Sequence, residues 1–190
     1  MGYFEKKLSG NVVYNGIIVS VRMDKAEVAS GHIVNREVVD HPGGVAVLPV
    51  DGEGNAYLVR QFRYPFMKEM LEVPAGKLEP GEDPLECAIR ELKEETGFTA
   101  GEIIDMHVIY ASPGISSEVL HAYLAIDLSS GQMELEEDEF LSVEKWPLDE
   151  LLEMCLNGEI HDGKTIITIM KATEILKRRG GYFGKQDSDR

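Results

Sequence analysis

Cysteine, basic side chains and long apolar runs are all scarce in this 190-residue chain. Its two cysteines, Cys87 and Cys155, are too few for a disulfide framework and lack a C-x-x-C spacing, so we expect the reducing environment of the cytoplasm. No apolar stretch reaches the roughly 18 residues of a membrane span, and no charged-then-apolar leader stands near the start. Neither membrane insertion nor export is expected.

The shortage of basic residues also limits the kind of ligand that the protein can bind. Only 19 lysines and arginines stand against 34 acidic residues, which gives a formal net charge of -15. Nucleic-acid binding requires a basic surface, so we do not expect a nucleic-acid partner. An anionic ligand would need a local arginine cluster or a bound cation. With 43% hydrophobic residues, the chain can still bury a core of ordinary size.

The order of residue patterns predicts an α/β protein with a small β-module at its N-terminus. β-Branched and apolar runs broken by polar residues predict strands at 11–23 and 33–39, and the turn sequence His-Pro-Gly-Gly follows them. We expect an N-terminal β-module over residues 1–42, a main domain over 43–178 and a flexible tail over 179–190. In the main domain, similar patterns predict strands at 45–50, 56–63, 71–74, 107–114 and 118–128, and helices at 84–96, 146–157 and 165–179.

The helix predicted over 84–96 has clear signals at both ends. Asp83 is a favourable N-cap, Pro84 suits the first helical position, and Glu86 stands three residues after the cap, as in a capping box. Gly97 is placed to end the helix. These signals predict a helix that runs from Pro84 to Thr96.

Acidic residues crowd the second half of this helix. Four apolar side chains gather on one face at about 100° per residue, and we expect them to pack onto a sheet: Leu85, Ala88, Ile89 and Leu92. Glu91, Glu94 and Glu95 lie beside that face, where carboxylates one turn apart repel each other. Either they form a solvated acidic face, or a cation lies among them. Carboxylates without histidine or cysteine are hard oxygen ligands, which suit Mg²⁺ or Mn²⁺.

The stretch from Gly76 to Phe98 resembles the Nudix hydrolase family. It fills every fixed position of the Nudix box, G-x5-E-x7-R-E-U-x-E-E-x-G-U, in which U is apolar: Gly76, Glu82, Arg90, Glu91, Leu92, Glu94, Glu95, Gly97 and Phe98. The resemblance implies a Nudix α/β/α sandwich with a mixed sheet, preceded here by the small N-terminal β-module. It also implies metal-dependent hydrolysis of a nucleoside diphosphate linked to another group.

The same resemblance implies roles for several box residues. Glu91 and Glu95, with Glu94 nearby and the backbone carbonyl of Ala75, would hold two or three Mg²⁺ or Mn²⁺ ions. Arg90 would orient these glutamates through charge-assisted hydrogen bonds. Arg90 and Glu94 are therefore expected to belong to the catalytic machinery.

Outside the box, the chain resembles the ADP-ribose pyrophosphatase branch of the family up to about residue 175. The likeness rests on the segments REVVDHPGGVAVLPV, LVRQFRYP, LEVPAGKLEPGE and YASPGISSE, and on Pro113, sixteen residues after Gly97. It implies that Arg36 and Glu37 lie at the adenine end of the ligand and Arg63 near its phosphates and ribose. The wall facing the terminal ribose would consist of Ser112, Pro113, Gly114 and Glu118. It further implies a homodimer in which the N-terminal module reaches the partner's active site.

The reaction also requires a general base outside the box, because a water must be deprotonated next to the pyrophosphate. The acidic segment 134–140 offers one. The resemblance to this branch implies that the base comes from a loop at a similar position, and alignment on Phe140 then favours Glu139, with Glu136, Glu137 and Asp138 as alternatives. The expected reaction converts ADP-ribose and water to AMP and ribose 5-phosphate. Two alternatives stay open, namely a Nudix pyrophosphatase for another nucleotide sugar such as GDP-mannose, and a non-catalytic ADP-ribose sensor.

Overall fold

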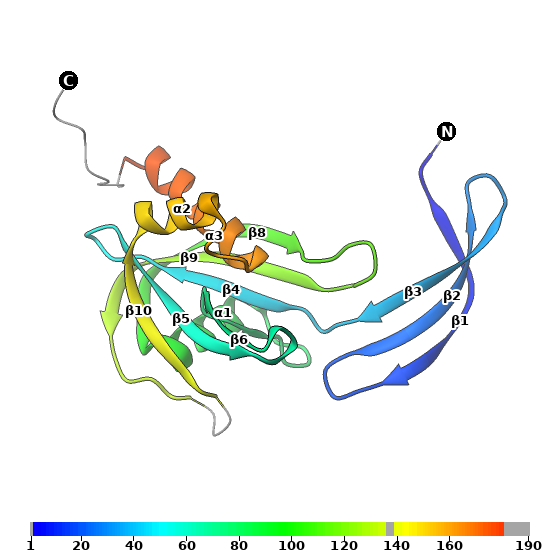
Figure 1. Cartoon of the computed structure of the whole chain (residues 1–190), viewed down its shortest axis with the longest axis horizontal. Helices are drawn as coiled ribbons and strands as arrows, with labels where there is room; N and C mark the ends of the chain where they lie inside the picture. Colours follow the sequence, from blue (N-terminus) through cyan, green and yellow to red (C-terminus); the bar gives the residue numbers. More distant parts are fainter. Residues whose placement is uncertain (1, 136–138, 181–190) are drawn as a thin grey trace. The chain divides into compact units, whose positions relative to one another are not determined.

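The computed structural model describes residues 2–135 and 139–180, and these form two compact units. The first unit combines Met1–Gly43 with Tyr110–Val119, and the second combines Gly44–Ile109 with Leu120–Arg190. Figure 1 shows the strands and helices in sequence colours. Among the described residues, no helix is both long and apolar enough to cross a membrane.

The first unit is built on a three-stranded antiparallel sheet in the order β1-β2-β3. Its strands are β1 (Glu5–Asn15), β2 (Ser20–Val28) and β3 (Ile33–Asp40). The prediction of a strand at 33–39 is confirmed, whereas the single strand predicted over 11–23 is wrong. The chain reverses there, with the amide of Gly16 donating to the carbonyl of Val19 at 2.9 Å. The Asn-Gly pair at 15–16 is a frequent turn sequence, which explains the break.

The segment 110–119 is joined to β3 within the first unit. The amide of Val39 donates to the carbonyl of Ile115 at 2.8 Å, and the amide of Ser117 donates to the carbonyl of Val39 at 2.9 Å. The strand predicted at 107–114 is therefore wrong over its second half, because the strand β8 (Phe98–Tyr110) begins much earlier and ends at Tyr110. Beyond that point the backbone turns, and Ser112 accepts from the amide of Ile115 at 3.1 Å.

The described residues of the second unit form two sheets, three α-helices and one short 3-10 helix. The strand order is β7-β4-β9-β8 in the first sheet, where β4 and β9 run parallel, and β10-β5-β6 in the second. The remaining elements are β4 (Gly44–Pro49), β5 (Asn55–Arg63), η1 (Tyr64–Phe66), β6 (Lys68–Glu72), β7 (Ala75–Lys77), α1 (Pro84–Thr96), β9 (Val119–Ser130), β10 (Leu141–Pro147), α2 (Leu148–Asn157) and α3 (Gly163–Arg178).

Every residue of strand β4 is buried, and its side chains take part in two separate core clusters. Ala46 and Leu48 pack in the cluster that includes residues of α2 and α3, while Val45 and Val47 pack in the cluster that includes residues of α1. Alternate side chains of a strand point to opposite faces, so both faces of the mixed sheet carry helices. The predicted α/β/α sandwich, preceded by a separate N-terminal β-sheet, is confirmed.

Other predicted boundaries differ from the structure for local reasons. The strand predicted over 71–74 splits into β6, which ends at Glu72, and β7, which begins at Ala75. Pro74 has no amide hydrogen for a sheet ladder, although its carbonyl accepts from the amide of Val47 at 2.8 Å. Strand β10 was not predicted, and it takes up Trp146 and Pro147, which we had placed in the following helix.

Candidate active site

Helix α1 carries the clustered glutamates and has the predicted bounds. The side chain of Asp83 accepts hydrogen bonds from the amides of Leu85 at 2.9 Å and Glu86 at 3.3 Å. Gly97 ends the helix in the left-handed conformation, with φ of 72°, and its amide donates to the carbonyl of Lys93. Both end signals that were read from the sequence therefore act as predicted, and they fix the register of the glutamates.

The buried face of α1 differs from the predicted one. Ala88 and Leu92 are buried as expected, but Leu85 and Ile89 are exposed. The buried arc is displaced towards Glu91, which is 7% exposed, and Glu95, which is 3% exposed. The two glutamates are thus part of the buried face itself. Placing two carboxylates there is costly unless hydrogen bonds or a cation compensate for the lost water.

Gly76 in strand β7 makes room for one of these carboxylates. A Cβ atom built on Gly76 would stand 1.7 Å from Oε1 of Glu91 and 2.5 Å from Oε2. Any side chain at position 76 would therefore displace Glu91. This close approach gives the glycine of the box a physical function, since it lets a buried carboxylate lie directly over the backbone of β7.

Arg90 links the exposed side of the helix to the glutamates. Its guanidinium donates to Glu82 at 2.9 and 3.1 Å, to Glu91 at 2.8 Å and to Glu94 at 2.9 Å. The hydrogen bonds from Arg90 to Glu82 lower the pKa of Glu82 to about 2, with a backbone hydrogen bond from Glu79 adding to the effect. Arg90 thus holds three carboxylates together, through contacts of the kind that we predicted for it.

Glu95 and Glu91 have raised pKa values because burial disfavours their ionised forms. The pKa of Glu95 is raised to about 8, chiefly by loss of water and further by the charges of Glu91 and Glu139. One hydrogen bond opposes this shift, from the amide of Ala75 to Oε2 of Glu95 at 3.0 Å. A divalent cation between the carboxylates would favour their ionised forms instead.

The described part of the chain has no group of three or more histidine, cysteine, aspartate or glutamate side chains already arranged to hold a metal ion. The donor chemistry nevertheless fits a hard cation. Two carboxylates, Glu91 and Glu95, are buried, and the charge of Glu91 contributes to the raised pKa of Glu95. The space over Gly76 that Glu91 occupies exists only because that residue has no side chain. The residues fit Mg²⁺ or Mn²⁺ better than zinc.

Of the four candidates for the general base, only Glu139 lies among the described residues. Its charge contributes to the raised pKa values of both Glu91 and Glu95, which indicates that it lies near this pair. Glu136, Glu137 and Asp138 lie outside the described residues.

Arg63 ends strand β5 and forms an ion pair that the sequence did not suggest. Its Nε and Nη2 atoms donate to the two carboxylate oxygens of Glu72 at 2.8 and 2.7 Å. Lys164, at the start of α3, also contacts Glu72. The only sequence signal for Glu72 was an acidic residue between Leu71 and Val73 in an otherwise apolar run.

The remaining predicted site residues belong to the first unit. Arg36 on β3 forms an ion pair with Glu5 at 2.6 Å, and Glu37 is its neighbour on the same strand. Glu118 lies 3.7 Å from Nδ1 of His41. The turn that joins β8 to the segment paired with β3 contains the other three: Ser112, Pro113 and Gly114.

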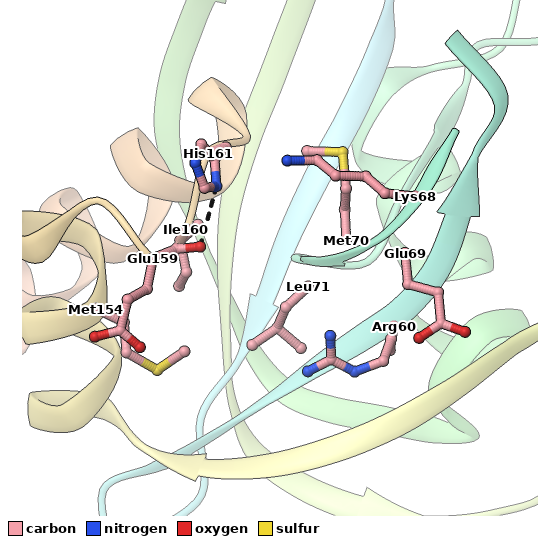
Figure 2. A pocket seen from close by; sticks show the side chains of 9 residues that line it. All are labelled: Arg60, Lys68, Glu69, Met70, Leu71, Met154, Glu159, Ile160 and His161. Carbon is pink, nitrogen blue, oxygen red and sulfur yellow. Dashed lines mark hydrogen bonds between the residues drawn. The ribbon is translucent and has the colours of Figure 1, made fainter. Parts of the chain in front are cut away.

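The second unit also has a pocket of about 250 Å³ (Figure 2). None of the predicted site residues lines it. Its wall combines apolar side chains with charged ones, and Figure 2 labels all of them: Arg60, Lys68, Glu69, Met70, Leu71, Met154, Glu159, Ile160 and His161. This pocket is therefore distinct in its lining from the glutamate cluster on α1.

Comparison with known proteins gives concordant results. The model of the NUDIX domain matches residues 40–167. An ADP-ribose pyrophosphatase of Bacillus subtilis (strain 168) is 40% identical over 167 residues, which cover 87% of this chain and 90% of the relative. A methanol dehydrogenase activator of Bacillus methanolicus is 37% identical over 179 residues, with 92% and 97% coverage. A GDP-mannose pyrophosphatase of Shigella flexneri is 33% identical over 145 residues, with 70% and 75% coverage.

A solved structure described as an ADP compounds hydrolase shares the fold. It superposes with a TM-score of 0.82 at 24% sequence identity, covering 93% of this chain and 96% of the other. The box, the buried glutamates, the domain match and these identities agree, and the chain belongs to the Nudix hydrolase family.

Proposed function

We propose that this protein hydrolyses the pyrophosphate of ADP-ribose to AMP and ribose 5-phosphate with the help of divalent cations. The observation that carries the proposal is the buried pair Glu91 and Glu95, with Glu91 set over Gly76 and tied to Arg90. The 40% identity to an ADP-ribose pyrophosphatase over most of both chains supports the choice of substrate.

The proposed cation site consists of Glu91, Glu95 and the carbonyl of Ala75, with Glu94 nearby. Two or three Mg²⁺ ions, or Mn²⁺ in their place, would neutralise the pyrophosphate and promote deprotonation of the attacking water. The hydrogen bonds from Arg90 keep Glu91 and Glu94 from spreading apart under their mutual repulsion. These side chains therefore supply a fixed set of anionic oxygens at the start of the reaction.

The remaining steps are assigned to side chains around this set. Glu139 would accept the proton of the water that attacks phosphorus, a role that agrees with its electrostatic influence on Glu91 and Glu95. Arg63 would contact the phosphates through its guanidinium. We assign Arg36 and Glu37 to the adenine end of the substrate. The wall around the terminal ribose is assigned to Ser112, Pro113, Gly114 and Glu118.

We further propose a homodimer in which the module 1–42 mediates assembly and contacts substrate, residues 43–178 form the hydrolase domain, and 179–190 form a flexible tail. Strand β1 is exposed along its whole length, including the apolar side chains of Val12, Val13 and Tyr14. A three-stranded sheet with such a strand buries little surface by itself, so a second copy is a natural partner. The two free cysteines favour a cytoplasmic location.

A panel of nucleotide sugars tests the proposed activity. The parent chain should release AMP from ADP-ribose with Mg²⁺ and not without it, and Mn²⁺ should substitute. Preference for GDP-mannose would favour the alternative suggested by the GDP-mannose pyrophosphatase relatives. Tight binding of ADP-ribose without turnover would instead favour a sensor and would refute the proposed reaction.

A pair of variants in one segment tests the general base. Glu139→Gln should lower kcat by about 100-fold or more with little change in KM, as expected for loss of general-base catalysis. Glu134→Gln is the matched control, because Glu134 pairs with Lys93 at 2.8 Å and has no proposed catalytic role. Full activity of Glu139→Gln would move the assignment to Glu136, Glu137 or Asp138.

A further inference from the structure

A buried acidic residue at the end of β6 connects α3 to the predicted phosphate-binding arginine. Glu72 is 1% exposed, which is unusual for a carboxylate, and its two oxygens accept from Arg63 at 2.8 and 2.7 Å. Lys164 provides a second cation on the same carboxylate. The two cations keep the pKa of Glu72 below its ordinary value although burial alone would raise it. The bidentate geometry defines the plane of the Arg63 guanidinium.

The first turn of α3 also helps to hold the Glu72–Arg63 ion pair in place. Asp162 caps the helix by accepting from the amide of Thr165 at 2.9 Å and from its hydroxyl at 2.6 Å. It also pairs with Lys164 at 3.0 Å. The hydroxyl oxygen of Thr165 in turn accepts from the amide of Val73 at 2.9 Å, next to Glu72. The helix therefore fixes both the side chain of Glu72 and the adjacent backbone.

The arrangement leaves part of Arg63 available for a ligand. The side chain of Arg63 is 38% exposed, and within the described residues its Nη1 atom makes no hydrogen bond. The negative charge of Glu95 also acts on Arg63. Without a fixed partner, a flexible guanidinium would turn towards the α1 glutamates and compete with the cation for them. The contact with Glu72 opposes that movement.

Lys164 changes the electrostatics as well as the geometry. If Glu72 were paired with Arg63 alone, its carboxylate would neutralise most of the positive charge of Arg63. Glu72 pairs with both Arg63 and Lys164, and Lys164 also pairs with Asp162, so the net charge of these four side chains is zero. Because Lys164 offsets part of the charge of Glu72, more of the positive charge of Arg63 stays available to an anion. Loss of Lys164 should therefore weaken pyrophosphate binding even if Arg63 keeps its place.

We propose that Glu72 and Lys164 are positioning residues that hold the guanidinium of Arg63 with its free edge presented to the substrate pyrophosphate. This inference rests on the proposed function of the site, in which Arg63 contacts the phosphates. It adds α3 to the elements that determine substrate affinity, although Glu72 and Lys164 lie outside the Nudix box.

A double-mutant cycle tests the inference. We expect Lys164→Met to lower kcat/KM for ADP-ribose by about 10- to 100-fold, mainly through KM, because a displaced contact at a reacting group has this order of effect. Arg63→Ala should lower it at least as much. Because Lys164 acts through Arg63, adding Lys164→Met to Arg63→Ala should cause less than a twofold further loss. Lys164→Arg should restore most of the activity.

Lys68→Met is the matched control. Lys68 is exposed on the same strand as Glu72, faces Arg63 across the β5–β6 pair, and lines the pocket in Figure 2. Removing its charge should change kcat/KM by less than about twofold, since surface charges have small effects. The melting temperature of every variant shows whether a loss of activity reflects unfolding.

Binding of ADP, measured by calorimetry without turnover, separates this inference from the proposed function. If the parent cleaves no nucleotide sugar, the proposed reaction is wrong. The role of Lys164 can still be decided by measuring the Kd for ADP of the parent, the two single variants and the double variant. If the losses of ADP affinity in the two single variants multiply in the double variant, Lys164 acts independently of Arg63, which would overturn the inference. So would full affinity in Lys164→Met, or ADP binding that Arg63→Ala leaves unchanged.

Discussion

Replacing Glu95 by glutamine should stabilise the metal-free protein and abolish its cation-dependent activity. Glutamine has nearly the same shape, and its side-chain oxygen can still accept from the amide of Ala75, which donates to Glu95 at 3.0 Å. The glutamine side chain is uncharged, so no ionised group is buried at position 95. The substitution therefore removes the cost of a buried carboxylate and, with it, a ligand for the cation.

The size of the stabilisation follows from the pKa of Glu95, which burial raises from 4.5 to about 8. Below pH 4.5 the group is protonated in both the folded and the unfolded chain. As the pH rises from 4.5 through 8, the unfolded chain loses this proton first, so the folded chain loses stability relative to the glutamine variant. At about 1.4 kcal/mol per pH unit, the difference is about 3 kcal/mol at pH 7.

Thermal unfolding with and without Mg²⁺ measures both effects. Without metal, the variant should melt about 6–12 °C above the parent at pH 7, given about 2–4 °C per kcal/mol for a chain of this size, and the two should converge near pH 4.5. Added Mg²⁺ should raise the melting temperature of the parent alone. Hydrolysis of ADP-ribose should fall by at least about 100-fold in the variant.

The control is Glu86→Gln, an exposed position in the first turn of the same helix. Its stability should change by only a few tenths of a kcal/mol, with little dependence on pH. A Glu95→Gln variant that is less stable than the parent at pH 7, or that retains Mg²⁺-dependent stabilisation and turnover, would refute the reasoning.

Three further predictions concern helix α1, its N-cap and strand β7. Gly76→Ala should reduce Mg²⁺-dependent hydrolysis by about 100-fold or more, because its Cβ would displace Glu91, whereas Gly52→Ala, which has open space around it, should keep full activity. Arg90→Lys should lower kcat by about 10-fold or more, since a compact ammonium lacks the planar guanidinium fork that donates twice to Glu82 and once each to Glu91 and Glu94. Unchanged steady-state kinetics would contradict this role. Asp83→Ala should cost about 1 kcal/mol in urea unfolding through loss of the N-cap, and an unchanged midpoint would show that the cap does not contribute.

Features with strong local signals were predictable from the sequence. The bounds of α1 were predicted correctly because Asp83, Pro84 and Gly97 act within one turn of the positions that they define. The strands β4 and β5 were found within one residue because apolar runs and turn residues delimit them. Strand β10 was missed because its pattern mixes charged and apolar residues, and its pairing with β5 supplies the order that its own sequence does not.

The choice of buried face on α1 shows where local reasoning fails. Periodicity placed Leu85 and Ile89 inside, but contact with Val45 and Val47 turns the helix so that Glu91 and Glu95 are buried instead. Hydrophobicity alone would not choose this orientation. Buried carboxylates with raised pKa values, such as Glu91 and Glu95, are typical of functional sites.

By itself, the sequence determined the family, the class of chemistry and the register of the box glutamates, because fixed spacing on one helix is a local property. Only the tertiary structure decided which carboxylates are buried, that Gly76 makes room for Glu91, and that Arg63 and Lys164 converge on Glu72. Positions 72 and 164 are distant in the chain, and their contact depends on how α3 packs beside β6. Burial and ion pairing of this kind depend on packing between distant segments, which residue spacing does not encode.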